Sequence, residues 1–391
     1  MRFTTAGESH GKALVAILGG VPAGLPLLAE DVDRELRRRM AGYGRGARMK
    51  IEADAVELLA GVRAGETIGS PIALLVPNRD WENWRDVMAP EPDPPGSDKR
   101  RRRVTRPRPG HADLVGVLKY AREDARDVLE RASARETTAR VACGAVCRRL
   151  LAEFGVEIGS HVVELGGIRA PVPDTLPATL NEVADRSAVR CLDATASQRM
   201  IDAIDQAKAD GNTLGGVVEV VASGLVLGLG SHVSWDRKLD GRLGQAILSI
   251  PAVKGVEIGL GFEAARRPGS DVHDEIGSGG AARAGGFVRR TNRAGGLEAG
   301  MTTGEPLVLR VAMKPISTLM RPLGTVDLET REAAKAQSER SDVTAVPAMG
   351  VIAEAMTALV LANAMTEKFG GDSLVEMRAN YDGYVARINR P

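Results

Sequence analysis

The stretch VPAMGVIAEAMTALVLANAMTEKFGG, residues 346–371, decides the fold that this sequence predicts. Pro347 suits the first turn of a helix, and Gly370 suits its end. The residues between them are apolar on nearly every side, and a helix without a polar face belongs between layers rather than on a surface. Glu354 interrupts the apolar run, so the stretch falls short of an unbroken membrane span. The sequence therefore predicts a soluble protein built around a buried helix.

Helix-like and strand-like segments are mixed along the rest of the chain. Further helices are predicted at 30–40, at 135–155 and, opened by Ser197, at 197–211. Valine-rich segments predict one or two strands at 215–230 and another strand at 304–315. We therefore expect one α+β domain over the whole chain, residues 1–391, with sheets outside and long helices inside.

The composition is that of an ordinary soluble protein. The chain has 391 residues, of which 43% are apolar and 26% charged, and its formal net charge of +1 argues against a protein built wholly around nucleic acid. Three cysteines are too few for a disulfide framework, and no signal-peptide pattern opens the chain. We expect a reduced, cytoplasmic protein. Residues 88–103 are interpreted as an exposed excursion rather than a domain boundary.

Two histidines lie in tight loops. His10 stands in TTAGESHGKALVA, residues 4–16, and His111 follows Gly110 in RPRPGHADL, residues 106–114. The first loop looks like a phosphate loop, but it is one residue short of the Walker spacing, and Ala13 stands where Ser or Thr should follow the lysine. We therefore reject a nucleotide-hydrolase function and keep a tight loop with a titratable group.

Several arginines lie beside glycine turns or a helix start, where forked donors and backbone amides can bind phosphate or carboxylate. They are Arg39, Arg45 and Arg48 in 37–52, and Arg131 and Arg135 beside Ser133 and Thr137. Two plainer interpretations stay open. The first cluster could be the solvated basic end of a helix, and Ser133 with Glu136 could form a capping box.

A further polar group precedes the buried helix. Lys314, Ser317 and Thr318 follow a predicted strand, and Arg340 and Asp342 lie in the loop before residue 346. A carboxylate beside an arginine in a loop can be a positioned base or a simple turn residue. The histidines show no paired metal-ligand spacing. Two histidines beside anion-binding arginines indicate proton transfer on a phosphorylated, carboxylated small molecule.

Eight ordered motifs resemble the chorismate synthase family, and the resemblance covers residues 3 to about 370. They are GESHG, GYGRGARMKIE, RPGHADL, RASARETTARVA, SIPAVKGVEIG, GGLEAGM, KPISTL and RSDVTAVPA. The resemblance implies a lyase that converts 5-enolpyruvylshikimate 3-phosphate to chorismate and phosphate by anti-1,4 elimination. This is the last common step of aromatic amino-acid biosynthesis, in the shikimate pathway. It implies a need for reduced FMN without net redox change, a sandwich of antiparallel sheets around long helices, and a homotetramer.

The resemblance also implies roles for individual residues. Substrate anions would be bound by Arg39, Arg45, Arg48, Arg135 and Arg340, of which Arg39 and Arg45 are also described in the family as binding NADPH, a possible reductant. FMN would be lined by Arg131, Ala132, Ser133, Pro251, Ala252, Ala299, Lys314, Pro315, Ile316, Ser317, Thr318 and Arg340. The catalytic residues would be His10 near the leaving phosphate, His111 near the N1–C2 carbonyl edge of the flavin, and Asp342 near flavin N5.

Two residues depart from the family pattern. Many members have Asn at the position of Pro251. Proline in place of that Asn removes one side-chain amide from the flavin pocket. Many have Gly-Gly where this chain has Ala299-Gly300. Two other classes of protein remain as alternatives. A nucleic-acid-binding protein using Lys99–Arg103 would need stacking aromatics, which make up only 3% of the chain. An NADPH-dependent flavin reductase would not need His10 or so many anion-binding arginines.

Overall fold

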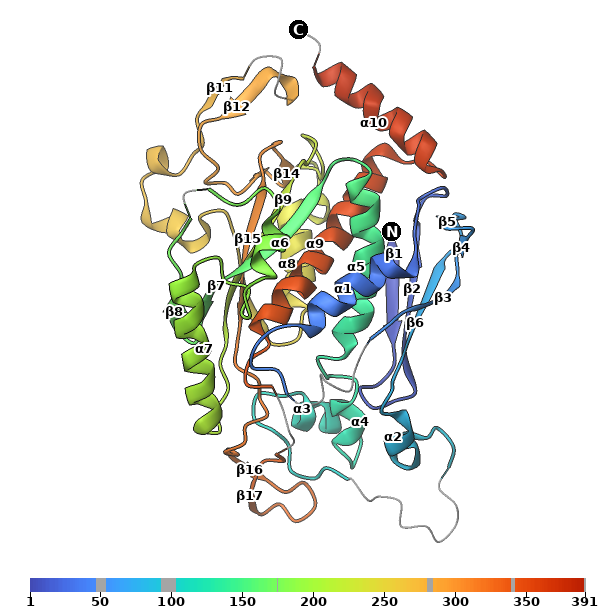
Figure 1. The fold of residues 1–391 in the computed structure, drawn as a ribbon, viewed down its shortest axis with the longest axis vertical. Coiled ribbons are helices and arrows are strands. Elements are labelled where there is room, and N and C mark those ends of the chain that lie inside the picture. Colours follow the sequence, from blue (N-terminus) through green and yellow to red (C-terminus); the bar gives the residue numbers. More distant parts are fainter. Residues whose placement is uncertain (47–53, 93–102, 174, 280–283, 339–341, 390–391) are drawn as a thin grey trace.

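The computed structural model describes the chain except residues 47–53, 93–102, 174, 280–283, 339–341 and 390–391 (Figure 1). Two antiparallel sheets enclose the central helices. The first sheet has the order β1 (Arg2–Ala6), β2 (Ala13–Gly19), β6 (Ile72–Pro77), β3 (Glu57–Ala60). The second has the order β10 (Val253–Ile258), β15 (Leu307–Met313), β9 (Gly216–Ser223), β7 (Glu157–Leu165), β8 (Ile168–Arg169).

Three helices fill the space between the sheets. Helix α5 (Glu136–Ala152) packs on the first sheet, and α9 (Val346–Phe369) packs on the second. The two helices also pack on each other, and α1 (Ala29–Met40) packs on both. Figure 1 shows this layering, with β1, β2, β3 and β6 on one side of the helices and β7, β9 and β15 on the other. The predicted α+β sandwich of antiparallel sheets around long helices is therefore confirmed.

The remaining elements cover the ends and edges of this sandwich. The other helices are α2 (Trp81–Met88), α3 (Asp113–Lys119), α4 (Arg126–Leu129), α6 (Leu180–Ala184), α7 (Ala194–Ala209), α8 (Leu239–Leu248) and α10 (Leu374–Ile388). The short strands are β4 (Val62–Arg63), β5 (Glu66–Thr67), β11 (Ile276–Ser278), β12 (Phe287–Arg289), β13 (Leu297–Glu298), β14 (Met301–Thr302), β16 (Gly324–Val326) and β17 (Ala333–Lys335). Helices α2, α3 and α4 lie together at the lower end of Figure 1.

Helix α9 has the predicted bounds and burial. Pro347 stands in its first turn and Gly370 caps its end with a φ of 59°. The helix approaches α5 so closely that only glycine fits at position 144, because a Cβ there would lie 2.4 Å from Ala355 Cβ and 2.6 Å from Ala355 Cα. Among the described residues, α9 is also the one helix long and apolar enough to cross a membrane, yet 89% of its apolar window is buried inside the protein. It is therefore a core helix, packed inside the protein.

Glu354, the acidic residue of α9, is fully buried and ionised. Its Oε1 accepts hydrogen bonds from Arg38 (3.1 Å) and Arg190 (3.2 Å), and its Oε2 accepts from Arg38 (2.9 Å) and Arg148 (2.7 Å). Burial by itself raises the pKa of Glu354, but the three arginines outweigh it and hold the pKa far below its ordinary value. The cluster joins α1, α5 and α9 by charge as well as by apolar packing.

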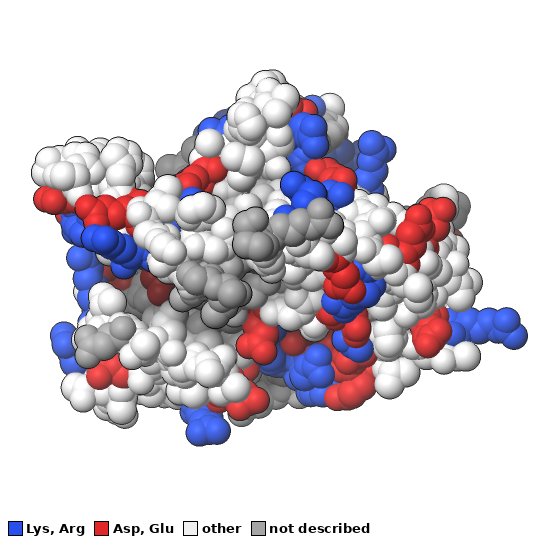
Figure 2. Space-filling view, turned by 90° about the horizontal axis from the view of Figure 1, so that it is seen from above, with Lys and Arg blue, Asp and Glu red and all other residues white. Residues whose placement is uncertain are grey.

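Three details differ from the sequence predictions or extend them. Helix α7 begins at Ala194 rather than Ser197, because the Asp193 side chain accepts the Ala196 N–H and caps the helix. Segment 215–230 forms a single strand, β9. Residues 89–92 of the predicted excursion are exposed, and 93–102 lie outside the described residues. Figure 2 shows acidic and basic side chains interspersed over the described part of the face that it views.

Candidate active site

The hairpin between β1 and β2 carries His10. Gly7 has a φ of 109°, and a Cβ there would lie 2.5 Å from the Ala13 carbonyl oxygen, so the turn closes this tightly only with glycine. The turn places Ser9 and His10 inside the protein, with exposed fractions of 4% and 9%. The sequence predicted a tight loop with a titratable group, and the structure has one.

His10 is held by residues that the sequence did not single out. Its Nδ1 lies 2.9 Å from both carboxylate oxygens of Glu130, and its backbone N–H donates to Glu130 Oε2 at 2.9 Å. The imidazole stacks on Trp84 of α2 with a centroid separation of 3.7 Å. Arg126 donates to Glu130 Oε1 at 2.9 Å. Although burial raises the pKa of Glu130, its contacts with His10 and Arg126 lower it below its ordinary value, so the carboxylate is ionised.

The turn before α5 faces this loop. Arg131 donates to the Thr5 carbonyl at 2.9 Å and to the Gly7 carbonyl at 3.2 Å. Ser133 Oγ donates to Ser9 Oγ at 3.2 Å. The capping box considered for Ser133 and Glu136 does not form. Helix α5 begins at Glu136, its N-cap residue is Arg135 rather than Ser133, and no side chain caps it. These side chains instead tie the helix start to the His10 hairpin.

Two of the predicted anion-binding arginines share one buried carboxylate. Arg135 Nη2 lies 2.9 Å from Asp54 Oδ1, and Arg39 Nη1 lies 4.0 Å from Asp54 Oδ2. Arg39 also donates to Thr137 Oγ1 at 2.9–3.0 Å and to the Ala134 carbonyl at 2.8 Å. Both arginines are buried. The alternative of a solvated helix end is therefore wrong for Arg39. Two guanidinium groups against one carboxylate leave a positive site that suits an anion.

Arg45 and Asp342 form an ion pair between the loop after α1 and the loop before α9. Arg45 Nε lies 2.9 Å from Asp342 Oδ2, and the Gly46 N–H donates to Asp342 Oδ1 at 2.6 Å. Arg45 is 10% exposed and Asp342 is 22% exposed at the side chain. Among the described residues, the loop carboxylate of Asp342 therefore pairs with Arg45. Arg340 and Arg48 lie outside the described residues.

His111 stands in a loop fixed by charge. Its Nδ1 lies 2.5 Å from Asp113 Oδ1, and Arg108 Nε donates to Asp113 Oδ2 at 2.8 Å. Asp113 is completely buried. Burial raises the pKa of Asp113, but its hydrogen bonds with His111 and Arg108 hold it well below the ordinary value. Each histidine of the candidate site therefore has a buried, ionised carboxylate on Nδ1.

The predicted flavin segment 314–318 packs against the His111 loop. Lys314 Nζ donates to the Gly110 carbonyl at 2.9 Å, and Ser317 Oγ donates to the same oxygen at 3.0 Å. Arg108 Nη1 donates to Thr318 Oγ1 at 2.9 Å. Burial, and then the charge of Lys254, lower the pKa of Lys314. These contacts join segments about 200 residues apart.

A cavity of about 1000 Å³ opens between the two histidine loops. Its lining includes Glu8, His111, Arg126, Glu130, Arg131 and Ala132. Small-molecule and cofactor sites commonly occupy about 300–1,000 Å³. The cavity is therefore large enough for a mononucleotide cofactor, and its arginines offer donors for anionic oxygens. Among the described residues, no group of three or more His, Cys, Asp or Glu side chains could hold a metal ion.

One predicted flavin residue lies apart from the others within a single chain. The Lys314 N–H donates to the Ala252 carbonyl at 2.9 Å, so Ala252 and the neighbouring Pro251 adjoin segment 314–318. Ala299 instead adjoins the start of α8, where the Leu239 N–H donates to the Gly300 carbonyl. Ala252 follows the end of that helix, and ten helical residues span about 15 Å. Ala299 also has a φ of 49°, so the departure from glycine adds backbone strain to the extra methyl.

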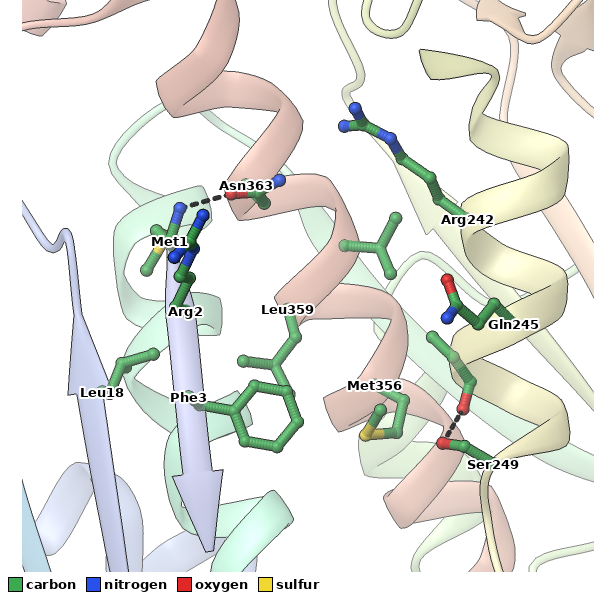
Figure 3. A pocket seen from close by; sticks show the side chains of 12 residues that line it. Met1, Arg2, Phe3, Leu18, Arg242, Gln245, Ser249, Met356, Leu359 and Asn363 are labelled. Carbon is green, nitrogen blue, oxygen red and sulfur yellow. Dashed lines mark hydrogen bonds between the residues drawn. The ribbon is translucent and has the colours of Figure 1, made fainter. Parts of the chain in front are cut away.

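A second hollow, of about 340 Å³, lies elsewhere and contains none of the predicted site residues. Figure 3 shows side chains of β1, α8 and α9 around it, with Leu359 beside Phe3. Its lining is largely apolar and includes Met356 and Leu18. The residues that line it include no histidine, aspartate or glutamate.

The sequence and the fold were compared with those of known proteins. The family model for chorismate synthase matches residues 1–366. The chain is 58% identical over 396 residues to a chorismate synthase of Symbiobacterium thermophilum, with 100% of both chains covered, and 56% identical over 396 residues to one of Geobacter sulfurreducens, with 99% of both covered. A solved structure described as a crystal structure of chorismate synthase superposes with a TM-score of 0.79 at 44% identity, covering 99% of this chain and 98% of the other. The chain therefore belongs to the chorismate synthase family, whose members are carbon–oxygen lyases.

Proposed function

We propose that this protein converts 5-enolpyruvylshikimate 3-phosphate to chorismate and phosphate by anti-1,4 elimination, with reduced FMN as cofactor, in a single catalytic domain over residues 1–391. The observation that carries the proposal is the shared cavity. His111 borders it directly, and Glu130, which holds His10, borders it from the opposite loop. The same cavity reaches Arg131 and Ala132 at the start of α5.

The arginines would bind the anionic groups of the substrate. Arg39 and Arg135 keep a net positive charge after pairing with Asp54. Arg45 would contact a substrate carboxylate or phosphate while still paired with Asp342, since a guanidinium carries five donors. Arg48 and Arg340 are assigned to the same role by family resemblance. Holding the substrate by several charged contacts orients it for elimination.

His10 would act as the acid for phosphate departure, and Asp342 as the base on the opposite side of the reaction. The buried position of His10 excludes bulk water from its proton. Asp342 is held by Arg45 and Gly46, which fixes the direction of its carboxylate. Bound reduced FMN would supply electron density to the carbon that loses phosphate. His111, on Asp113, would face the flavin ring.

The residues present fit FMN. The cavity volume is sufficient, and Arg131 on its lining offers donors. Ser133, Lys314, Ser317 and Thr318 lie outside that lining and are assigned to the cofactor by family resemblance. The apolar part of the FMN site would be formed by Pro251, Ala252, Pro315 and Ile316. Ala299 would reach the site from a second copy of the chain, because in one chain it lies at the other end of α8. This separation supports the homotetramer that the family resemblance implies.

The reductant and the compartment complete the proposal. NADPH is the proposed reductant, with Arg39 and Arg45 binding it. A cytoplasmic location is supported by the three free, buried cysteines, because reducing compartments keep thiols unpaired.

An anaerobic assay tests the proposed function. Purified protein is mixed with FMN, dithionite and 5-enolpyruvylshikimate 3-phosphate, and both phosphate release and the absorbance of a new diene are followed. Equal rates for the two signals support the elimination. Absence of phosphate release, together with flavin reduction in a second assay that contains NADPH in place of dithionite, would establish the flavin-reductase alternative instead.

A further inference from the structure

We propose that Glu130 is a positioning residue that fixes the orientation and the tautomer of His10, so that the ring exchanges its proton with substrate through Nε2. The inference deepens the proposed function and rests on it, because it concerns the same phosphate departure. It is carried by the geometry of one buried carboxylate against one imidazole.

Glu130 holds His10 at both the backbone and the ring. Its two oxygens lie 2.9 Å from His10 Nδ1, and its Oε2 also accepts the His10 backbone N–H at 2.9 Å. An ionised carboxylate only accepts hydrogen bonds, so Nδ1 must carry the proton. The hydrogen bond made by one ring nitrogen sets the state of the other. An imidazole has two nitrogens, and proton exchange with substrate therefore passes through Nε2.

Two further described neighbours, Trp84 and Arg126, help to fix the plane of the ring. Trp84 stacks on His10 at 3.7 Å with an interplanar angle of 30°. Arg126 lies 5.2 Å from the centroid of the Trp84 ring and donates to Glu130 Oε1. Arg126 thus holds both supports of the histidine in place. Side chains locked in this way keep a catalytic group in its productive geometry.

Glu130 also fits the proton balance of the step. As the C–O bond breaks, its electron pair goes to the phosphate oxygen, which takes the proton from Nε2 of the imidazolium. The ring becomes neutral and keeps the proton on Nδ1, which donates a hydrogen bond to Glu130. The carboxylate of Glu130 stays ionised throughout. Without the carboxylate, the neutral ring of His10 could rotate, or its proton could move to Nε2. A protonated Nε2 could not accept the next proton.

The test is the substitution Glu130→Gln, which preserves size but removes the charge. With pre-reduced FMN, we expect kcat to fall about 10- to 100-fold, less than the roughly 10²- to 10⁴-fold contribution of the general acid itself. The KM for substrate should stay within about threefold, since Glu130 orients the acid and does not bind substrate. Glu153→Gln is the matched control, because Glu153 pairs with Arg149 at the far end of α5. It should leave both constants unchanged.

A double-mutant cycle separates positioning from a merely structural role. In a His10→Ala background, Glu130→Gln should cause no further loss of kcat, because the residue that it positions is gone. Losses that multiply in the double variant would overturn the proposal, as would a raised KM with normal kcat. If Glu130→Gln does not fold, Glu130→Asp, which keeps the charge but shortens the side chain, is expected to lower kcat in the same way. Failure of the wild-type protein to release phosphate would refute the proposed function instead.

Discussion

Replacing Glu354 by Gln should destabilise the protein severely, although glutamine has nearly the same size. The carboxylate of Glu354 has an exposed fraction of 0% and accepts from Arg38, Arg148 and Arg190. Ser160 Oγ (2.6 Å) and Asn181 Nδ2 (3.1 Å) also donate to it. A glutamine would present an NH₂ group to donors on at least one side, and the arginines would lose their countercharge.

The magnitude follows from burial. Removing one partner of a buried ion pair costs about 3–5 kcal/mol, because the remaining charge is left uncompensated. The loss is large against a typical free energy of unfolding of about 5–15 kcal/mol. A pair near the surface such as Arg149–Glu153, whose side chains are 28% and 26% exposed, contributes only about 0–1 kcal/mol, so Glu153→Gln serves as the control here too.

The effect should depend on pH in a defined direction. Burial by itself would raise the pKa of Glu354. Arg38, Arg190 and Arg148 outweigh burial and hold the pKa below its ordinary value. A carboxyl with a lowered native pKa stabilises the fold above its unfolded pKa of about 4.3, and the stabilisation is lost as the pH falls below that value. The free-energy difference between wild type and Glu354→Gln should therefore be full at pH 7 and shrink below about pH 4.

Urea unfolding followed by far-ultraviolet circular dichroism measures both parts of this prediction. The wild type, Glu354→Gln and Glu153→Gln are compared at pH 7 and at several values between pH 5 and pH 3. A loss below about 1 kcal/mol at pH 7, in the range of a surface pair, would refute the argument. A loss that stays constant down to pH 3 would show that the charge of Glu354 is not its cause.

Three further substitutions, one of them with a matched control, test the core and the site. Asp342→Asn can keep the hydrogen bond from Gly46 but cannot take up a proton, so turnover with chemically reduced FMN should fall about 10²- to 10⁴-fold; retention of more than about a tenth would make Asp342 structural. Arg45→Ala should raise the substrate KM by about tenfold or more, from about 1.5–3 kcal/mol of charge-assisted contact, and an unchanged KM contradicts a binding role. Gly144→Ala should lower stability by about 1–3 kcal/mol because its methyl meets Ala355 at 2.4 Å. Gly244→Ala, with nothing within 4 Å, should be neutral or stabilising in the same unfolding measurement.

The layers of the fold could be predicted from the sequence because the deciding signal is local. The all-round apolar pattern of 346–369, with Pro347 and Gly370 at its ends, is enough to place a helix in the core. The start of α7 was predicted three residues late, because Ser197 and Asp193 are both acceptable caps and only the structure shows which side chain accepts the Ala196 N–H. Boundaries of this kind depend on geometry that propensity alone does not fix.

The candidate site was predicted only in part. His10, His111 and the arginines could be predicted because histidine next to glycine and arginine beside tight turns are unusual patterns. Glu130, Trp84 and Asp54 were missed, since each is an ordinary polar or aromatic residue in sequence and gains its role from a partner far along the chain, 120 residues away in the case of Glu130 and His10. Glu354 was read only as an interruption of an apolar helix. A buried acid in such a helix implies cationic partners, but the sequence does not say which arginines they are.

The core and the candidate site are connected through the same three helices. Arg39 lies in the last turn of α1, Arg135 precedes α5 and Asp342 precedes α9. The starts of α5 and α9 carry partial positive charge from their backbone N–H groups, which would favour the anionic groups of the proposed substrate. The contact of Gly144 with Ala355 and the charge cluster of Glu354 fix the relative position of these helices from within the core. The spacing of Arg39 and Arg135 is therefore set by the packing of α1 against α5, and a site built on rigid elements would keep the precision that the proposed elimination requires.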